Sequence, residues 1–358
     1  MIRVGIDSQI ADVSSAGIGQ FTAALVHWLP RVDTKAEYVL LRPAGRQRDF
    51  SMPGRWWWDQ VVVPNRAKGQ RLDVVLKPSF SVPIRSSVPT VVVLHDLAAR
   101  LFPEQLNRPS AWFYGRWAPW TLRFARLIIA VSEFTAGEAT KLLGIPSHRI
   151  RVVHESGDHL ATPRPQSYDD EVMNKFSLAE QFILHVGTIE PRKNLAFLVR
   201  TFAEFWKTRT SYQLVLAGAE GWKSRQVHDT VRELKLGQTV RFLGKISDDE
   251  RRALYRRARA LVLPSLYEGF GRPVLEAMAS GTPVVAAKAS AIPEVAGKAG
   301  LLVDGFSVAA WVDALKIAAA DERRRAELRA VGFEQSRRFS WERTARQIAE
   351  ILHEVADD

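Results

Sequence analysis

Hydrophobic residues in this chain gather in short continuous runs, separated by longer amphipathic stretches. Runs such as FILHV and ALVL lack polar alternation, which is typical of parallel strands covered on both faces. The amphipathic stretches predict helices, so the pattern favours a doubly wound α/β fold. The predicted strands are 2–7, 37–41, 60–63, 72–76, 90–94, 127–131, 150–153, 182–186, 213–217, 239–243, 260–263, 283–286 and 301–303, and helices are predicted at 18–29, 133–143, 194–207, 248–257 and 272–280.

The strand series runs twice, which predicts two Rossmann-like domains at 1–160 and 166–338. Between them, the polar segment 154–170 holds two prolines and is typical of a linker. Ser340 is a predicted N-cap of a last helix that runs to about Val355, and we expect this C-terminal helix (340–356) to pack back on the N-terminal domain. Two such domains facing a central cleft would bind a ligand at the carboxyl ends of their strands.

Composition narrows the class of protein. The chain has 358 residues, 46% of them hydrophobic, which is enough for two cores. The absence of cysteine excludes disulfides and thiolate metal sites and fits a reducing cytoplasm. Arg3 and Asp7 interrupt the first apolar run, which indicates a buried strand rather than a signal peptide. No apolar run reaches the roughly 18 residues of a membrane span, so we expect a cytoplasmic protein, at most peripheral on the inner face of the cytoplasmic membrane.

The formal net charge of +11 favours anionic partners. The arginines are spread along the chain without a zinc-finger spacing or an RNA-recognition signature, so nucleic acid is not the predicted partner. Residues 111–126 mix aromatic side chains with arginines. This segment predicts either contact with an anionic membrane or a helix packed on the sheet with arginines at its rim.

The stretch 264–281 carries the strongest chemical signal. After the strand ALVL come Glu268, the loop Gly269–Phe270–Gly271, Pro273 and Glu276. The glycines permit a tight turn, and Pro273 fits the first turn of a helix. Backbone amides at such a helix start suit an anion or a polar sugar edge, and an acid one turn inside can accept hydrogen bonds from a ribose diol. The alternative is a pair of surface acids flanking an ordinary turn.

A second signal follows the strand FILHV. Arg192 and Lys193 precede a predicted helix that begins near Asn194, at the carboxyl end of a strand. Two cations in this place form a diphosphate site, and the alternative is a surface turn with Asn194 as a cap. The chain has no Asp-x-Asp motif. With two cations to stabilise a diphosphate, no metal is required.

Three further segments lie at predicted strand or helix ends. Gly17 and Gly19 open the first helix and would let backbone approach a ligand. His95 follows a strong strand, where a histidine is either structural or faces a ligand site. Glu294 lies in the segment AIPEVAG, which is either a capped loop or part of a nucleotide site.

The segments EGFGRPVLE and EPRKN resemble the signature motifs of the retaining glycosyltransferases of family 4, which have the GT-B fold. The resemblance implies that Glu276 holds the nucleotide ribose and that Lys193 contacts the diphosphate, with Arg192 supplying further charge. It places Glu268 against the donor sugar as a catalytic residue. Arg272 stands where many relatives have an apolar residue, and it would either reach a phosphate or point to solvent.

The resemblance extends to the other segments. It implies that Gly269, Phe270 and Gly271 contact sugar hydroxyls or phosphate, that the loop with Gly17 and Gly19 lies near the donor phosphate, and that Glu294 lies under the nucleotide. His95 would contact the donor sugar or shape the acceptor site, and it is our second predicted catalytic residue.

The implied activity is retaining hexosyl transfer from a nucleoside diphosphate sugar, with the nucleotide sugar as substrate and no cofactor. The subgroup resembles bacterial mannosyl and rhamnosyl transferases of lipopolysaccharide and exopolysaccharide synthesis. It favours GDP-mannose as donor and a glycan or polyprenyl-diphosphate-linked acceptor. A sugar-nucleotide 2-epimerase of GT-B fold, and a basic nucleic-acid or membrane-binding module, are the alternatives.

Overall fold

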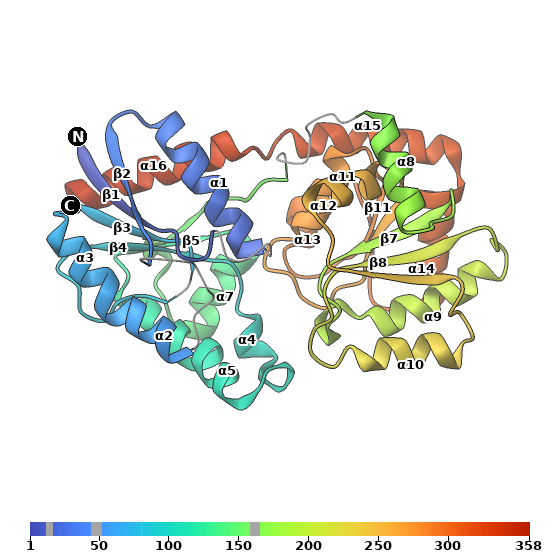
Figure 1. Cartoon of the computed structure of the whole chain (residues 1–358), viewed down its shortest axis with the longest axis horizontal. Helices are drawn as coiled ribbons and strands as arrows, with labels where there is room; N and C mark the ends of the chain where they lie inside the picture. Colours follow the sequence, from blue (N-terminus) through green and yellow to red (C-terminus); the bar gives the residue numbers. More distant parts are fainter. Residues whose placement is uncertain (12–16, 44–51, 80, 158–164) are drawn as a thin grey trace. The chain divides into compact units, whose positions relative to one another are not determined.

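The computed structural model describes residues 1–11, 17–43, 52–79, 81–157 and 165–358, and they form two compact units (Figure 1). Unit 1 comprises Met1–Glu155 together with Ser340–Asp358, and unit 2 comprises Ser156–Phe339. The chain therefore leaves unit 1 once, after Glu155, and returns to it at Ser340.

Unit 1 is built on a parallel sheet whose strand order is β2-β1-β3-β4-β5-β6. This order, in which the chain first adds β2 on one side of β1 and then β3 to β6 on the other side, is that of a doubly wound fold. Strands β3, β4 and β5 are buried along their whole length, as their continuous apolar runs predict. The strands are β1 Ile2–Asp7, β2 Ala36–Leu41, β3 Val74–Lys77, β4 Thr90–Leu94, β5 Leu127–Ala130 and β6 Ile150–Val152.

Helices cover both faces of this sheet, with α1 and α16 on one face and α2, α3 and α7 on the other (Figure 1). A run of short helical turns, from α4 to η4, connects β4 to β5. No helix among the described residues is both long and apolar enough to cross a bilayer. The helical elements of unit 1 are α1 Gly17–Val32, α2 Met52–Trp57, η1 Trp58–Val62, α3 Val63–Gly69, α4 Ala98–Leu101, η2 Pro103–Gln105, α5 Arg108–Trp112, η3 Phe113–Trp117, α6 Ala118–Thr121, η4 Leu122–Phe124, α7 Glu133–Leu143, η5 Ser147–Arg149 and α16 Trp341–Asp357.

The last helix, α16, belongs to unit 1. The Ser340 hydroxyl accepts a hydrogen bond from the Arg343 amide at 3.2 Å, so the predicted N-cap is confirmed. Its apolar positions recur every three or four residues and are buried. Trp341 packs edge-on against Phe21 of α1 with ring centroids 5.5 Å apart, and Thr344 donates to the carbonyl of His154 at 2.7 Å.

Unit 2 repeats the architecture with a second parallel sheet, in the order β12-β11-β10-β7-β8-β9. Strands β7 and β10 are neighbours at its centre, so their carboxyl ends deliver the segments that follow them to the same sheet edge. The strands are β7 Phe182–Val186, β8 Gln213–Ala217, β9 Val240–Gly244, β10 Ala260–Leu263, β11 Val284–Ala287 and β12 Leu301–Val303.

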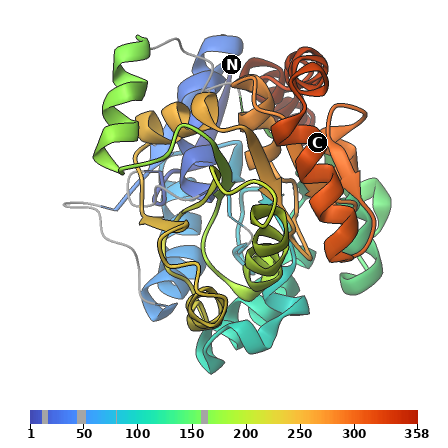
Figure 2. The same cartoon turned by 90° about the vertical axis from the view of Figure 1, so that its right-hand side faces the viewer.

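Helices α9, α10 and α14 cover one face of the second sheet and α11, α12, α13 and α15 the other, and the layers are seen again after a quarter turn (Figures 1 and 2). Trp311, Phe202 and Leu198 form part of the core between the sheet and the first of these layers. The helical elements of unit 2 are α8 Gln166–Lys175, η7 Pro191–Lys193, α9 Leu195–Trp206, α10 Arg225–Glu233, α11 Asp248–Arg257, α12 Arg272–Ala279, α13 Ile292–Ala296, α14 Val308–Leu315, η8 Lys316–Ala320 and α15 Glu322–Ser336.

The predicted strand at 60–63 is wrong. Residues 58–62 form a π-helical turn that continues into α3, with Pro64 in the first turn. The buried positions are Trp58, Val63 and Ala67, which recur at helical spacing and not in alternation. Proline has no amide to give to a sheet ladder but fits a helix start, so the valine run before it belongs to a helix. The predicted linker at 154–170 is also too long, because α8 begins at Gln166 and residues 158–164 lie outside the described residues.

Candidate active site

The loop after β10 has the conformation that its glycines and proline predict. Gly271 is the residue before α12 and has a φ of 102°, in the left-handed region that favours glycine. A Cβ atom there would lie 2.5 Å from Ile292 Cδ1, so space as well as backbone geometry calls for glycine. Pro273 occupies the first turn of α12, and Glu276 follows one turn later. Phe270 is buried and packs edge-on against Phe339.

Glu268 lies in this loop, and its carboxylate is held between two cations. Lys193 Nζ is 2.6 Å from Oε1, and Arg192 donates to Oε2 at 3.1 Å. The Ser265 hydroxyl donates to Oε1 at 2.6 Å. Burial alone would raise the pKa of this carboxyl, but Lys193, Arg192 and Ser265 outweigh burial and lower the pKa of Glu268 to about 2. Glu268 is therefore ionised at neutral pH although only 6% of it is exposed.

The two cations come from η7, the 3-10 turn after β7. Asn194 ends this turn with a φ of 55°, a left-handed conformation that asparagine adopts more readily than most residues, and its side chain does not cap α9. Arg192 also donates to the carbonyl of Tyr267 at 2.7 Å and pairs with Glu190 at 2.6 Å. Arg192 and Lys193 are thus brought onto Glu268 across 75 or more residues of sequence.

Glu276 is the centre of a separate group of donors on α11 and α12. Tyr255 donates to Oε2 at 3.1 Å, Arg251 Nε lies 3.4 Å from the same oxygen, and Arg272 donates to Oε1 at 3.2 Å. Arg272 is buried, so of the two alternatives for this residue the solvent-facing one is wrong. Burial and then the charge of Glu276 raise the pKa of Tyr255, which keeps its hydroxyl protonated as a donor.

His185 and Gly187 border the lysine of this site. His185 is fully buried in β7 and donates from Nδ1 to the carbonyl of Val262 at 3.0 Å, while Nε2 has no partner among the described residues. Burial, helped by the charge of Lys193, lowers the pKa of His185 to about 4, so the ring is neutral. A Cβ atom on Gly187 would lie 3.3 Å from Nε2 of His185 and 3.5 Å from Cε of Lys193. The neutral imidazole ring and the aliphatic part of the lysine side chain therefore both pack next to this glycine.

Sequence reasoning missed several residues of both groups. Ser265 and Glu190 lie within three residues of predicted site residues, yet nothing in the sequence marked them as partners. Arg251 and Tyr255 stand four apart on the predicted helix 248–257, so their shared face was a usable signal. Glu294 lies where predicted, in the first turn of α13, and is partly buried.

The remaining predicted residues belong to unit 1. Gly17 is the first residue of α1 and Gly19 is buried in its first turn, whereas residues 14–16 of the predicted loop lie outside the described residues. His95 follows β4 and is buried. Its Nε2 donates to the carbonyl of Pro78 at 2.9 Å, and its Nδ1 lies 2.8 Å from a carboxylate oxygen of Glu155. Both ring nitrogens are therefore hydrogen-bonded and the ring is fixed in place, while its catalytic role stays a prediction.

We expect stability to follow the titration of His95. Burial, the largest influence, lowers its pKa, but the hydrogen bond and charge of Glu155, with Pro78 and Asp96, together raise the pKa of His95 above its ordinary value. The folded state then binds the proton more tightly than the unfolded chain. The resulting stabilisation, ~1.4 kcal/mol per pKa unit, is complete below pH 6.5 and is lost as the pH rises through the folded pKa.

Urea unfolding across a pH series would measure this loss. His95→Gln should remove it, whereas His148→Gln, at an exposed position of unit 1, should leave the pH profile as in the parent protein. A parent profile that is flat from pH 6 to 9 would show that the His95–Glu155 pair gains nothing from charge.

Comparisons with known proteins identify the family of this chain. The model of glycosyltransferase family 4 matches residues 23–156, and the model of glycosyl transferases group 1 matches residues 169–335. The O-antigen chain mannosyltransferase B of Escherichia coli is 34% identical over 272 residues, which cover 75% of this chain and 71% of that protein. The serotype-specific mannosyltransferase WbdA of Escherichia coli is 31% identical over 285 residues, and this chain spans 33% of its length.

Solved structures agree on the fold. Sucrose-phosphate synthase from Thermosynechococcus elongatus superposes with a TM-score of 0.78 at 17% identity, with 99% of each chain covered. WaaG, a glycosyltransferase involved in lipopolysaccharide biosynthesis, superposes with a TM-score of 0.73 at 14% identity, covering 98% of this chain and 99% of WaaG.

Two Rossmann-like units with parallel sheets, together with these neighbours, define the GT-B fold. The enzyme is a hexosyltransferase. The chain belongs to the glycosyltransferase family 4-like group of surface-polysaccharide mannosyltransferases, and the resemblance of its motifs to that family is confirmed.

Proposed function

We propose that this enzyme transfers mannose from GDP-mannose, with retention of the anomeric configuration, to a nascent glycan or a polyprenyl-diphosphate-linked acceptor. The relatives that are O-antigen mannosyltransferases support mannose as the sugar and a surface polysaccharide as the product. A lipid-linked acceptor would place the reaction in the cytoplasm, at the inner face of the membrane.

The observation that carries the donor site is the contact of buried Lys193 and partly buried Arg192 with buried Glu268 at the carboxyl ends of β7 and β10. Arg192 already donates to the Tyr267 carbonyl, Glu268 and Glu190. Lys193 has three donor hydrogens, and Glu268 is its one hydrogen-bond acceptor among the described residues. Lys193 is therefore the better ligand for a diphosphate, and Arg192 the better support for Glu268.

The ionisation state of Glu268 decides its role. A carboxyl with a pKa of about 2 is too weak a base to take a proton from a sugar hydroxyl at neutral pH. Its fixed negative charge instead suits a sugar that develops positive charge at the anomeric carbon. Glu268 would therefore orient the donor sugar and stabilise the oxocarbenium-like state, and not act as a general base.

The proposed reaction follows from this assignment. The bond between the anomeric carbon and the diphosphate oxygen breaks, and Lys193 stabilises the negative charge that grows on the departing nucleoside diphosphate. The acceptor hydroxyl bonds to the anomeric carbon on the same face and gives its proton to the departing phosphate oxygen. This route requires no separate base and no metal. Glu276, already fixed by Tyr255, Arg251 and Arg272, would hold the ribose diol.

A donor panel tests the proposal. We expect GDP-mannose to raise the midpoint of thermal unfolding more than UDP-glucose, ADP-glucose or dTDP-rhamnose at equal concentration, because ligand that binds the folded state stabilises it. The anomeric configuration of the product, read by NMR, tests retention. GDP-mannose incubated without acceptor should be recovered nearly unchanged, and its conversion to another nucleotide sugar would replace the transferase proposal with an epimerase.

A further inference from the structure

The proposed mechanism gives no role to one buried nitrogen beside the donor site. His185, in β7, has no exposed surface, and its Nδ1 donates to the carbonyl of Val262 at 3.0 Å. A carbonyl oxygen can only accept, so the ring carries its hydrogen on Nδ1 and a lone pair on Nε2. Nε2 has no hydrogen-bond partner among the described residues. Buried polar atoms in native proteins are nearly always hydrogen-bonded, so an acceptor without a donor at this place needs a partner.

Lys193 has the complementary deficit. Its ammonium group has three hydrogens, and Glu268 Oε1, 2.6 Å away, is its one hydrogen-bond acceptor among the described residues. Only 7% of Lys193 is exposed, so water has little access to the other two hydrogens. A diphosphate oxygen would accept one of them. One hydrogen of the ammonium group would then still lack an acceptor in a buried position.

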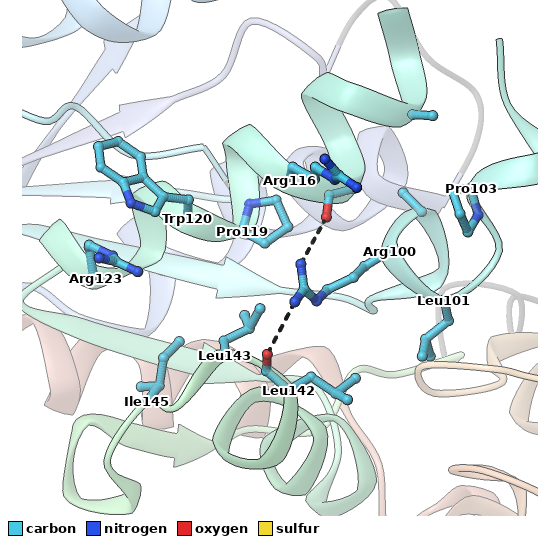
Figure 3. Close-up of a pocket in the computed structure, with 13 residues that line it drawn as sticks. Arg100, Leu101, Pro103, Arg116, Pro119, Trp120, Arg123, Leu142, Leu143 and Ile145 are labelled. Carbon is cyan, nitrogen blue, oxygen red and sulfur yellow. Dashed lines mark hydrogen bonds between the residues drawn. The ribbon is translucent and has the colours of Figure 1, made fainter. Parts of the chain in front are cut away.

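An exposed cation of unit 1 shows the difference that water makes. Arg100 lines a groove of about 720 Å³, where it donates to the carbonyls of Gly115 at 3.4 Å and Leu142 at 3.5 Å (Figure 3). Arg100 is exposed, so water in the groove can accept hydrogen bonds from its remaining hydrogens. Lys193 has no such supply of water and must find its acceptors in the protein or in the ligand.

The two deficits lie side by side at Gly187. A Cβ atom on this glycine would lie 3.3 Å from Nε2 of His185 and 3.9 Å from Nζ of Lys193. The unpaired acceptor and the lysine donor therefore border the same small space, which Gly187 leaves open because it has no side chain. Rotation about the Cδ–Cε bond of Lys193 moves Nζ and leaves the rest of the side chain in place.

We propose that His185 is a positioning residue of the donor site, whose Nε2 accepts a hydrogen bond from the Lys193 ammonium when a sugar nucleotide is bound. Lys193 would then be held by three acceptors, which are Glu268, His185 and the departing phosphate oxygen. The ring must be neutral for this role, and burial, helped by the charge of Lys193, lowers the pKa of His185 to about 4. The inference rests on the proposed function, because that function makes the diphosphate a ligand of Lys193.

Three substitutions of His185 test this role in the full-length enzyme. Asparagine keeps an amide donor at the position of Nδ1 but has no atom at that of Nε2. We expect His185→Asn to lower kcat by about tenfold or more, the usual effect of losing a hydrogen bond to a charged group. KM for GDP-mannose should stay near the parental value, because the bond orients a charge that matters most as the glycosidic bond breaks.

Glutamine carries an amide oxygen that reaches the position of Nε2, so His185→Gln should recover most of the parental kcat. His185→Phe lacks both nitrogens and should lose at least as much as His185→Asn, and it provides the test if the asparagine variant does not fold. Radiolabel transfer from GDP-mannose measures kcat in each variant. A parental kcat in His185→Asn or His185→Phe would overturn the proposal.

Combination with Lys193→Met shows whether His185 acts through the lysine. If it does, adding His185→Asn to Lys193→Met should cause no further loss of kcat. The same additional loss in both backgrounds would overturn the proposal. Failure of the proposed donor site has a different signature, since Lys193→Met by itself would then keep the parental kcat.

Nitrogen NMR of the histidine side chains observes the hydrogen bond without turnover. With saturating GDP, the Nε2 resonance of His185 should move toward that of a hydrogen-bonded nitrogen in the parent protein and not in Lys193→Met. An unmoved resonance, in parent protein whose thermal midpoint GDP raises, would overturn the proposal.

The matched control is Thr201→Val in α9. Thr201 is fully buried, and its Oγ1 also has no hydrogen-bond partner among the residues that the structure describes. Thr201→Val should keep the parental kcat. A loss equal to that of His185→Asn would assign the effect to the removal of any buried polar group and would overturn the proposal.

Discussion

Replacing Lys193 by methionine should lower kcat for sugar transfer by about 10²–10³-fold, the usual cost of removing one preorganised charge from the centre of a reaction. Methionine keeps most of the apolar stem but removes the charge that we propose to stabilise the departing diphosphate. The effect should fall on kcat and kcat/KM together, because that charge matters most as the bond breaks. Radiolabel transfer from GDP-mannose to acceptor, under saturating and limiting donor, would measure both constants.

The control for this variant is Lys207→Met, just after α9, where the lysine side chain is 67% exposed and pairs with Glu204. The kcat of Lys207→Met should be unchanged.

A second comparison separates the loss of the Lys193 charge from a disturbance of Glu268. In Lys193→Met, Glu268 loses its nearest cation, so the pKa of Glu268 should rise. In Glu268→Gln, the Lys193 amine stays in place and the thermal shift with GDP should persist. A Lys193→Met enzyme with parental kcat would remove Lys193 from the reaction.

Most of the fold could be predicted because the strands carry their own signal. A parallel strand covered on both faces is apolar at nearly every position, and β5 and β10 are apolar throughout. The same rule led to the wrong strand at 60–63. Over only four residues, a valine run in a helix cannot be told from a buried strand. Pro64, directly after the run, was a signal that the sequence did offer, whereas the burial of the Trp58 ring is a tertiary fact.

The site could be predicted only as far as its residues adjoin a motif. Glu268, Glu276 and Lys193 stand out by their spacing from glycine and proline turns. Their partners do not, because a hydrogen bond between residues 60 to 76 positions apart leaves no local trace. His95 with Glu155 is one such pair, and Arg192 with Glu268 is another. Sequence spacing therefore indicated which groups carry charge but not which charges neutralise one another.

This pairing matters because it sets the state of the unliganded site. Between Arg192, Lys193, Glu190 and Glu268 the formal charges cancel, so the group rests neutral before a donor arrives. In the proposed donor complex, a diphosphate would share Lys193 with Glu268. The same ammonium group would then contact both the sugar-facing carboxylate and the leaving phosphate, which would tie the position of Glu268 to the presence of donor.

Unit 1 contains the inverse arrangement, a buried cation between two carboxylates. Lys77, the last residue of β3, has no exposed surface. Its Nζ lies 2.7 Å from Asp7 and 2.6 Å from Asp59, and the Trp58 indole donates to Asp7 at 3.0 Å. Burial lowers the pKa of Lys77, but the two carboxylates outweigh burial and raise it, so the group stays charged. The pKa of Asp59 is raised, mainly by burial. The negative charge of Asp7 raises this pKa further, while Lys77 opposes the rise.

Lys77→Met should therefore destabilise unit 1 by about 3–5 kcal/mol, the cost of leaving buried charge without its partner. Asp7 and Asp59 would face each other without the cation, and the pKa of Asp59 would rise further. A carboxyl whose folded pKa exceeds its unfolded value of about 3.9 favours folding at low pH, and that contribution is lost as the pH rises. The deficit of the variant should thus shrink as the pH falls toward 5, as urea unfolding at several pH values would show.

Two variants bracket this result. Lys68→Met, at an exposed position of α3, removes the same charge and should leave unfolding unchanged. Lys77→Met combined with Asp59→Asn removes one carboxylate charge together with the cation and should recover part of the lost stability, because a single buried carboxylate with the Trp58 indole remains. If Lys77→Met unfolds at the parental urea concentration at pH 7, the buried charges are hydrated or neutral in solution, and the electrostatic account of this sheet edge fails.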